Sequence, residues 1–403
     1  MTREVGVEER RARLARRHRL LPQCRAEGAG AVPAVADAVV ALHSSDPVTV
    51  HLSAAARLRD PSVAAVEEAL YEDRSVVRHH AMRRTLWVAT PSVVRVVHAA
   101  ATRALVGPEH RRTVKLLAAG GVTDPEAWLA DARDRVVETL RDHGPMSARE
   151  LGAAVPALRQ RIVMSPGKAY SAEVSAHTRV LLLLGFEGTV VRTRPQGSWV
   201  SGAYRYALAE SWLGAPLGGD PHPFQEREAV GDLALRWLRA FGPAGAADLQ
   251  WWTGWGAATT RRALADCGAV EVAIESGPGW LAPGDEAPED PAGAWVALLP
   301  GLDPTTMGWK RRDWYLPERA RGAFDRMGNA GPTVWADGRV VGAWDQRPDG
   351  DLRTHLFEEL SAEHRELLDR RLAELAETLG DTRFTVRFPS PVSTALRAGA
   401  RLE

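Results

Sequence analysis

Residue types that can take part in hydrolysis stand together in the segment His43-Ser44-Ser45-Asp46-Pro47. Asp46-Pro47 predicts a helix start, because Asp is a favoured N-cap and Pro is favoured at the first helical position. The three residues before it then face a helix N-terminus, where unpaired backbone N–H groups attract anions. A neutral imidazole there can act as a base. Structural roles remain open: His43 as a polar loop residue, Ser45 as a secondary cap and Asp46 as the N-cap.

No competing catalytic motif accompanies this segment. The patterns G-x-x-x-x-G-K-[ST], G-x-G-x-x-G, H-E-x-x-H and G-x-S-x-G are absent, so a nucleotide hydrolase, a dehydrogenase and a zinc enzyme are not indicated. The 12 histidines are not spaced as metal ligands, and the two cysteines, Cys24 and Cys267, lie far apart. We therefore expect no metal, no disulfide and no cofactor, nucleotide cofactors included.

The basic residues are unevenly distributed along the chain. Residues 1–212 hold 30 Lys/Arg against 22 Asp/Glu, a net of +8, and residues 213–403 hold 21 against 29, a net of −8. In the segment 75–115, seven Arg and one Lys are opposed only by Glu109. This pattern is typical of an anion-binding surface, and Arg suits bidentate contact with phosphate. Solvated helix faces balanced in space by the acidic half are the alternative.

Composition indicates an ordinary globular protein. The 403 residues are 45% hydrophobic and 25% charged, with a formal net charge of zero. At roughly 150 residues per domain, the length predicts two to four domains. No stretch approaches the roughly 18 apolar residues of a membrane span, and the N-terminus has no apolar signal core. We expect a soluble cytoplasmic protein with no membrane partner.

Two segments share the same pattern of turn and helix-start residues. In Asp142–Val155 and Ala240–Gly254, Gly-Pro is followed at equal spacing by Ala, an acid and Leu, and each segment follows an amphipathic helix. A helix, a turn and a short helix form the pattern of a helix-turn-helix. Thr189–Gly202 alternates and turns at Pro195–Gly197, which predicts a β-hairpin. Helices followed by a hairpin predict a winged helix, and two unrelated helical hairpins are the alternative.

The last third of the chain changes character. Ser276–Gly293, rich in Pro, Gly and acids, predicts a linker. Strands are then predicted near Trp295–Leu299, Thr333–Trp335 and Val340–Trp344, followed by an amphipathic helix at Leu356–Leu379 and a last strand at Phe384–Phe388. These elements predict a small β-rich module covered by a helix.

The order of these features resembles the winged-helix DNA glycosylase family of the AlkZ/YcaQ type. The similarity runs over nearly the whole chain and includes His43–Pro47, Arg83–Val88, the two Gly-Pro turns and Leu298–Pro317. It implies an α+β, mostly α fold of tandem winged helices followed by a small C-terminal β-barrel with a covering helix. The implied domains are a first winged helix with the active-site loop at 1–122, a second at 123–222, a third with the linker at 223–290, and the barrel-like domain at 291–403. We expect a monomer, since no heptad seam is present.

The family motif is altered in this chain. Active members carry Gln, any residue, then Gln or Asp where this chain has His43-Ser44-Ser45, although Asp46-Pro47 is kept. The family reaction hydrolyses an N-glycosidic bond through an oxocarbenium-like state, and a cationic alkylpurine leaves without a general acid. The resemblance implies that His43 positions water, assisted by Ser45 and Asp46. It implies a monofunctional glycosylase for bulky or cationic alkylated purines, acting in alkylation or crosslink repair or in genotoxin resistance.

Double-stranded DNA is the expected partner. The predicted DNA-binding residues are Arg83, Arg84, Arg111, Arg112, Lys168, Arg192, Arg194, Trp199, Lys310, Arg311 and Arg312. The group Trp251, Trp252 and Trp255 fits base stacking or core packing, with packing favoured, and His79-His80 is expected to face phosphate or solvent. Two alternatives stay open: a non-catalytic winged-helix DNA-binding protein, structural or regulatory, and a receptor for a small anion.

Overall fold

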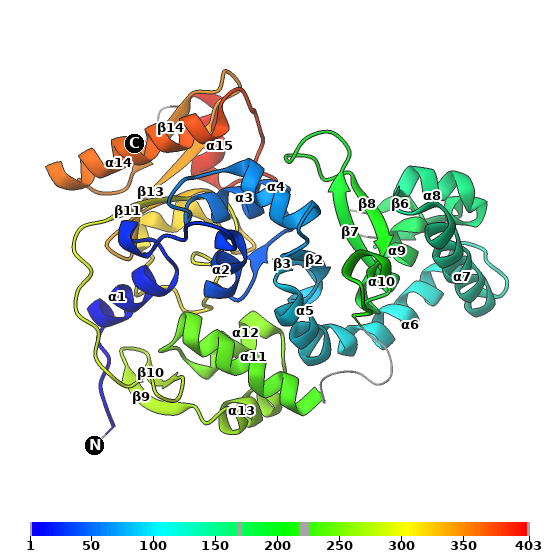
Figure 1. Cartoon of the computed structure of the whole chain (residues 1–403), viewed down its shortest axis with the longest axis horizontal. Helices are drawn as coiled ribbons and strands as arrows, with labels where there is room; N and C mark the ends of the chain where they lie inside the picture. Colours follow the sequence, from blue (N-terminus) through cyan, green and yellow to red (C-terminus); the bar gives the residue numbers. More distant parts are fainter. Residues whose placement is uncertain (1, 166, 168–170, 218–225, 401–403) are drawn as a thin grey trace.

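The computed structural model describes residues 2–165, 167, 171–217 and 226–400. Helices predominate in its mixed α/β architecture, and a central sheet joins a larger lobe to a smaller one (Figure 1). Within the described ranges, no helix is both long and apolar enough to cross a membrane.

The first structural unit contains the predicted helix start. Its elements are α2 (Ala31–Ala38), β1 (Leu42–His43), α3 (Pro47–Ala55), α4 (Val63–Tyr71), β2 (Val77–His80) and β3 (Leu86–Ala89). Asp46 caps α3 by accepting the Val48 N–H at 3.2 Å, as the sequence predicts. The short β1 pairs with β3 and places His43 opposite Trp87. The loop at residues 43–46 is therefore held between a sheet edge and a helix N-terminus.

The second unit has the same order of elements. It contains α7 (Pro125–His143), β4 (Met146–Ser147), α8 (Ala148–Ala154), α9 (His177–Phe186), β7 (Val190–Pro195), β8 (Tyr204–Leu208) and α10 (Ala209–Leu213). A capping box between Ser147 and Glu150 starts α8. A second hairpin, β5 (Arg161–Met164) and β6 (Ala172–Ser175), is inserted between α8 and α9. The predicted hairpin is confirmed in its first strand, β7, but its turn and second strand were misplaced: residues 196–203 form a longer connection, and β8 begins only at Tyr204.

The third unit repeats the order again. It comprises α11 (Glu226–Phe241), α12 (Ala246–Thr253), α13 (Ala257–Asp266), β9 (Val270–Ile274) and β10 (Gly277–Leu281). In all three units the short strand or bridge after the first helix pairs with the last strand: β1 with β3, β4 with β8, and Ala244 with Trp280 of β10. The predicted linker at Ser276–Gly293 was wrong at its start, because these residues form β10 against β9.

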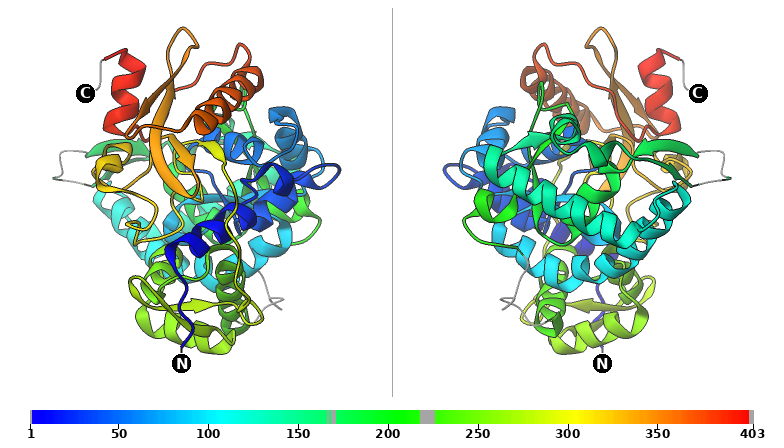
Figure 2. Two further views of the ribbon diagram at one scale, coloured as in Figure 1. Left: turned by 90° about the vertical axis from the view of Figure 1, so that its left-hand side faces the viewer. Right: turned by 90° about the vertical axis from the view of Figure 1, so that its right-hand side faces the viewer.

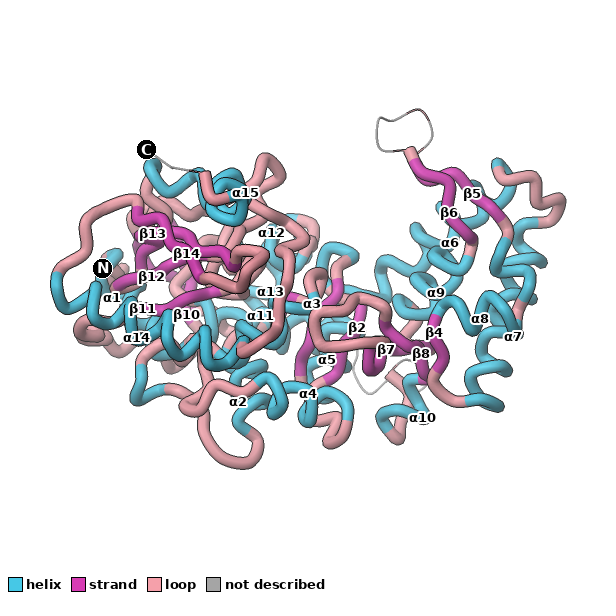
Figure 3. The backbone as a smooth tube through the Cα atoms, turned by 90° about the horizontal axis from the view of Figure 1, so that it is seen from above, coloured by secondary structure: helices cyan, strands magenta, loops and turns pink. Residues whose placement is uncertain are grey.

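One sheet connects the first two units. Its order is β1-β3-β2-β7-β8-β4, and β2 meets β7 where Arg78 pairs with Arg192. The chain crosses between the units through α5 (Pro91–Val97), a π-helical turn (His98–Thr102) and α6 (Arg103–Ala119). Leu117 of α6 packs in the core of the second unit. Seen from above, the backbone curves, with the β5–β6 hairpin and α15 (Pro391–Ala398) on one side of the central sheet and α2, α4 and α10 on the other (Figure 3).

The C-terminal module contains an open sheet and not the expected β-barrel. Its strands are β11 (Val296–Leu299), β12 (Thr333–Ala336), β13 (Arg339–Gln346) and β14 (Leu352–Leu356), in that order. Because β11 and β14 are the two edges, the sheet is open, and α14 (Ala362–Leu379) and α15 cover it. The predicted last strand at 384–388 is also wrong: these residues join no sheet, although Phe384 and Val386 are buried. Four short strands leave too few to close a cylinder.

The chain ends and short turns complete the architecture. Helix α1 (Val7–Arg17) follows a bridge between Glu4 and Ala273, so the N-terminus lies beside the β9–β10 hairpin, at the end of the molecule opposite α15 (Figure 2). Short 3-10 turns lie at Pro22–Cys24, Met82–Arg84, Pro156–Arg159 and Glu318–Ala323.

One face of α3 anchors the C-terminal module. Thr49 and Ser53 donate to the Gly301 carbonyl and the Asp303 carboxylate, both at 2.6 Å. Arg57 pairs with Asp303 through two hydrogen bonds of 2.8 and 2.9 Å, and both side chains are fully buried. Thr49 and Ser53 are four residues apart and share a helix face, and Arg57 follows in the turn after α3, where it also donates to the Ser53 carbonyl. The C-terminal module and the loop at residues 43–46 are therefore both attached to α3.

Candidate active site

The backbone of the His43-Ser44-Ser45 loop separates its three side chains. His43 is the last residue of β1, and the chain bends at Ser45 and Asp46 before α3 begins. The Ser44 hydroxyl accepts a hydrogen bond from Arg78 Nε at 2.8 Å. Arg78 is itself buried, donating to the Tyr71 hydroxyl at 3.0 Å and lying 4.4 Å from the Tyr204 ring. The Ser44 side chain is thus held by Arg78, and His43 and Ser45 remain as the candidates for chemistry.

His43 is a neutral, enclosed imidazole. Only 4% of the residue is exposed, and its ring meets that of Trp87 edge-on at 4.7 Å. The Ser45 N–H points at His43 Nδ1 over 3.4 Å, which assigns the ring proton to Nε2. Burial, and secondly the charge of Arg83, lower the pKa of His43 to about 3. A base this weak does not hold a proton at neutral pH, but Nε2–H can donate to a bound water.

The two residues that follow His43 and Ser44 differ in their availability. Ser45 is half-buried, and no hydrogen bond to its hydroxyl occurs within the described ranges. Asp46 uses one carboxylate oxygen to cap α3, and the other accepts the Arg387 N–H at 2.9 Å. Burial raises the pKa of Asp46, partly offset by these backbone hydrogen bonds. Both carboxylate oxygens of Asp46 thus accept structural hydrogen bonds, and its assistance in catalysis stays a prediction.

Two arginines gather at one tryptophan beside the loop. The Arg83 guanidinium lies 4.2 Å from the centre of the Trp251 ring, and that of Arg312 lies 5.5 Å from it. Burial and the charge of Arg312 lower the pKa of Arg83 to about 10, so Arg83 stays cationic. Within the described ranges no carboxylate forms an ion pair with either residue. Two cations held together without an acid favour an anion such as phosphate.

The other residues of the basic segment divide into two groups. Arg84 pairs at 2.9 Å with Glu109, which is buried and also binds Arg179. Arg111 and Arg112 on α6 are exposed and, in the described structure, form no ion pair. Lys168 lies outside the described residues. Arg111 and Arg112 are therefore available to DNA, and Arg84 is shared with Glu109.

The predicted wing residues are largely engaged within the protein. Arg194 binds Glu67 at 3.2 Å and Glu72 at 2.7 Å, and Arg192 is half-buried beside the rings of Tyr204 and Tyr206. Trp199 is 7% exposed and packs on His51, with ring centroids 5.1 Å apart. Arg194 and Trp199 are thus engaged by residues of α4 and α3 and by Glu72, and their contact with DNA stays a prediction.

Arg194→Ala should therefore change affinity for duplex DNA less than about two-fold, since an arginine already paired with two carboxylates adds little net charge to the surface. Fluorescence anisotropy with a labelled duplex measures the dissociation constant. A loss close to that caused by removing Arg83 would show that the Glu67 and Glu72 pairs open on binding.

The Lys310-Arg311-Arg312 segment is held by the third unit. Asp248 of α12 accepts the backbone N–H groups of Lys310 at 3.0 Å and Arg311 at 2.9 Å. The Arg311 side chain donates to the Ser276 carbonyl, and Arg312 donates to the Gly328 carbonyl. The Lys310 side chain is exposed. This segment thus brings Arg312 from the C-terminal module to Trp251 of the third unit.

Buried aromatic groups account for two further predictions. Trp252 packs in the core against Trp87 and Phe241, which confirms packing for that residue. The ring of Trp251 instead contacts the guanidinium groups of Arg83 and Arg312. The expectation that His79 and His80 face phosphate or solvent is wrong: both are buried, with His79 3.2 Å from His98. Residues 2–165, 167, 171–217 and 226–400 contain no His, Cys, Asp or Glu cluster able to hold a metal.

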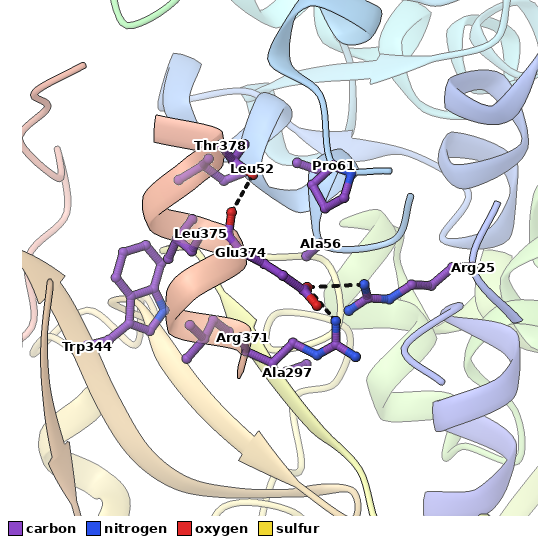
Figure 4. A pocket seen from close by; sticks show the side chains of 12 residues that line it. Arg25, Leu52, Ala56, Pro61, Ala297, Trp344, Arg371, Glu374, Leu375 and Thr378 are labelled. Carbon is purple, nitrogen blue, oxygen red and sulfur yellow. Dashed lines mark hydrogen bonds and ion pairs between the residues drawn. The ribbon is translucent and has the colours of Figure 1, made fainter. Parts of the chain in front are cut away.

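A small cavity lies away from this site, between α3 and α14 (Figure 4). Leu52, Ala56, Trp344 and Leu375 give it apolar walls, and Arg25 and Arg371 share the carboxylate of Glu374 at one end. None of the predicted catalytic residues lines it. This cavity is therefore separate from the His43–Asp46 loop.

Comparisons with known proteins place this geometry in context. A family model described as DNA glycosylase AlkZ-like matches residues 36–378. The solved structure of Streptomyces sahachiroi DNA glycosylase AlkZ aligns with a TM-score of 0.71 and 22% sequence identity, over 95% of this chain and 99% of that chain. The comparison with curated proteins finds no match. At this identity the structural likeness establishes the shared fold.

Proposed function

Because this chain belongs to the AlkZ-like DNA glycosylase family, we propose that it hydrolyses the N-glycosidic bond of cationic alkylated purines, bulky ones included, in duplex DNA. We further propose that its three repeated units are winged helices and that it acts in alkylation or crosslink repair or in genotoxin resistance. The observation that carries the substrate class is the absence of an available acid in the His43–Asp46 loop.

A neutral purine needs a proton before it leaves, and the loop has none to give. His43 is neutral at pH 7 because its pKa lies near 3, and both oxygens of Asp46 are occupied. An N7- or N3-alkylpurine already carries the positive charge, so its bond to C1′ breaks with the electron pair passing to the base nitrogen. The site therefore favours lesions that are cationic before they bind.

Water then completes the hydrolysis. In this proposal His43 Nε2–H and the Ser45 hydroxyl, two residues apart in the loop, position a water molecule for C1′ of the oxocarbenium-like sugar. Its oxygen forms the new bond, and its proton passes to solvent because His43 is too weak a base to keep it. With no free carboxylate in the loop, DNA phosphates held by Arg83 and Arg312 supply the negative charge near the sugar.

The test compares a cationic with a neutral adduct. Duplexes carrying a single N7-alkylguanine or a single O6-alkylguanine are incubated with the protein, and abasic sites are measured as alkali-labile strand breaks above the rate without protein. We expect breaks only with the N7 adduct. Excision of the neutral adduct at a similar rate would contradict the absence of a general acid.

A second candidate is a DNA-binding protein without catalysis. It is favoured by the same lack of a free carboxylate, since Ser45 stands where active family members carry Gln or Asp. The two candidates differ in one result: binding of N7-alkyl and bulkier cationic adducts with no abasic sites in any of them supports the non-catalytic protein.

Arg83→Ala combined with Arg84→Ala should weaken binding under either candidate. Removing two cations near the DNA should raise the dissociation constant on the order of ten-fold at 50 mM salt and reduce the slope of log K against log[salt] by up to about 2. Anisotropy titrations between 50 and 200 mM salt measure both quantities, with Arg194→Ala as the control. An unchanged salt slope would remove these residues from the DNA interface.

A further inference from the structure

A segment of the C-terminal module crosses the front of the active-site loop. Phe384 and Val386 are buried in the core that also holds Val48 of α3 and Trp199 of the β7–β8 connection. The Phe384 N–H donates to Gln346 Oε1 at 3.1 Å, which fixes the start of the segment to β13. The following residue, Arg387, is thereby placed at the loop.

Arg387 contacts the loop through its backbone and its side chain. Its N–H donates to Asp46 Oδ2 at 2.9 Å, and its Nη1 lies 3.5 Å from the Ser45 carbonyl oxygen. The side chain is exposed and, in the described part of the chain, forms no ion pair with a carboxylate. Its charge is therefore available to a ligand directly beside Ser45.

Gly202 of the β7–β8 connection makes room for this guanidinium. A Cβ at position 202 would lie 2.0 Å from Arg387 Nη2 and 2.9 Å from its Cζ. Gly202 does not have a positive φ, so its backbone conformation is open to other residues and the missing side chain is what matters. Ser45, Gly202 and Arg387, from three distant parts of the chain, meet around one cation.

We propose that Arg387 is a DNA-binding residue that holds a backbone phosphate at the target nucleotide, and that Gly202 keeps the space its guanidinium needs. The placement of this phosphate at the damaged nucleotide rests on the proposed function. Phosphate binding itself does not, because it is tested on undamaged DNA. The planar guanidinium suits a bidentate phosphate contact, and such contacts set the register of a protein on the duplex. The C-terminal module would thus position the strand over His43 and Ser45.

The first experiment removes the charge. Arg387→Ala should lower the slope of log K against log[salt] by about 0.9, which makes its affinity defect about 3.5-fold larger at 50 mM than at 200 mM salt. The matched control is Arg383→Ala: Arg383 is exposed in the same segment but donates to the carbonyls of Gly380, Thr382 and Asp349. It should keep the wild-type slope. Equal slopes for Arg387→Ala and wild type overturn the proposal.

The second experiment moves the guanidinium without changing any charge. Gly202→Ala should displace the flexible end of Arg387 and reduce affinity and excision in the same direction as Arg387→Ala, with an unchanged midpoint of urea unfolding. Gly6→Ala is the control, because a Cβ there meets no atom within 4 Å. Wild-type affinity and excision in Gly202→Ala overturn the proposal. Failure of the wild-type protein to excise any adduct contradicts the proposed function, whereas the affinities for undamaged DNA still decide the role of Arg387.

Discussion

Replacing His43 by alanine is expected to slow excision of an N7-alkylguanine by about 100-fold while changing affinity for the same duplex less than about two-fold. In the proposed mechanism the imidazole is one of two groups that position the attacking water, and removing one well-oriented hydrogen-bonding group from such a site costs roughly 100- to 1000-fold. Its exposed fraction is only 4%, so it adds little area to a DNA interface. Single-turnover strand-break assays and anisotropy measure the two effects separately.

His43→Gln is the matched variant. An amide can donate and accept hydrogen bonds at the same position. This variant should retain at least about a tenth of the wild-type rate.

The wild-type rate should also stay constant between pH 6 and 8, because His43, with a pKa near 3, does not titrate in that range. If His43→Ala weakens binding as much as it slows excision, the protein is better described as a binding module.

Stability is expected to fall by about 5 kcal/mol between pH 7.5 and pH 5.5. Burial lowers the pKa values of His18, His43 and His51 to about 3, and those of His79 and His80 well below the ordinary value. The unfolded chain takes up these protons as the pH falls through 6.5, while the folded chain does not. Each histidine then costs about 1.4 kcal/mol per pH unit until its folded pKa is reached.

Buried carboxyl groups oppose this trend only in part. Burial raises the pKa of Asp345 to about 6, so the folded state binds that proton first and gains stability as the pH falls. Burial also raises the pKa values of Asp46, Glu187 and Asp248, but by less, so these carboxyl groups do not balance five histidines. Urea unfolding at pH 7.5, 6.5 and 5.5 measures the effect, and His51→Gln should reduce the pH slope by about one proton. A free energy of unfolding that is equal at pH 7.5 and 5.5 would mean that water or local opening reaches these imidazoles.

Features set by neighbouring residues could be predicted from the sequence. The Asp46-Pro47 helix start, the repeated helix-turn-helix punctuation and the hairpin after the first copy depend on caps, turns and periodicity that are local in the chain. The resemblance on short motifs identified the family, which the family model matches over residues 36–378. These signals need no knowledge of what packs against them.

Only the tertiary structure decided which candidate side chains are available. The second carboxylate oxygen of Asp46 accepts a hydrogen bond from the backbone N–H of Arg387, which is 341 residues away. Arg194 forms ion pairs with Glu67 and Glu72, which belong to a different part of the chain. No sequence motif distinguished Arg387 from other arginines, and the burial of Trp199 depends on helix α3 packing against it. Burial, pKa and ion pairing are sums over neighbours in space, so a residue's type sets what chemistry it can do and the fold determines whether it is free to do it.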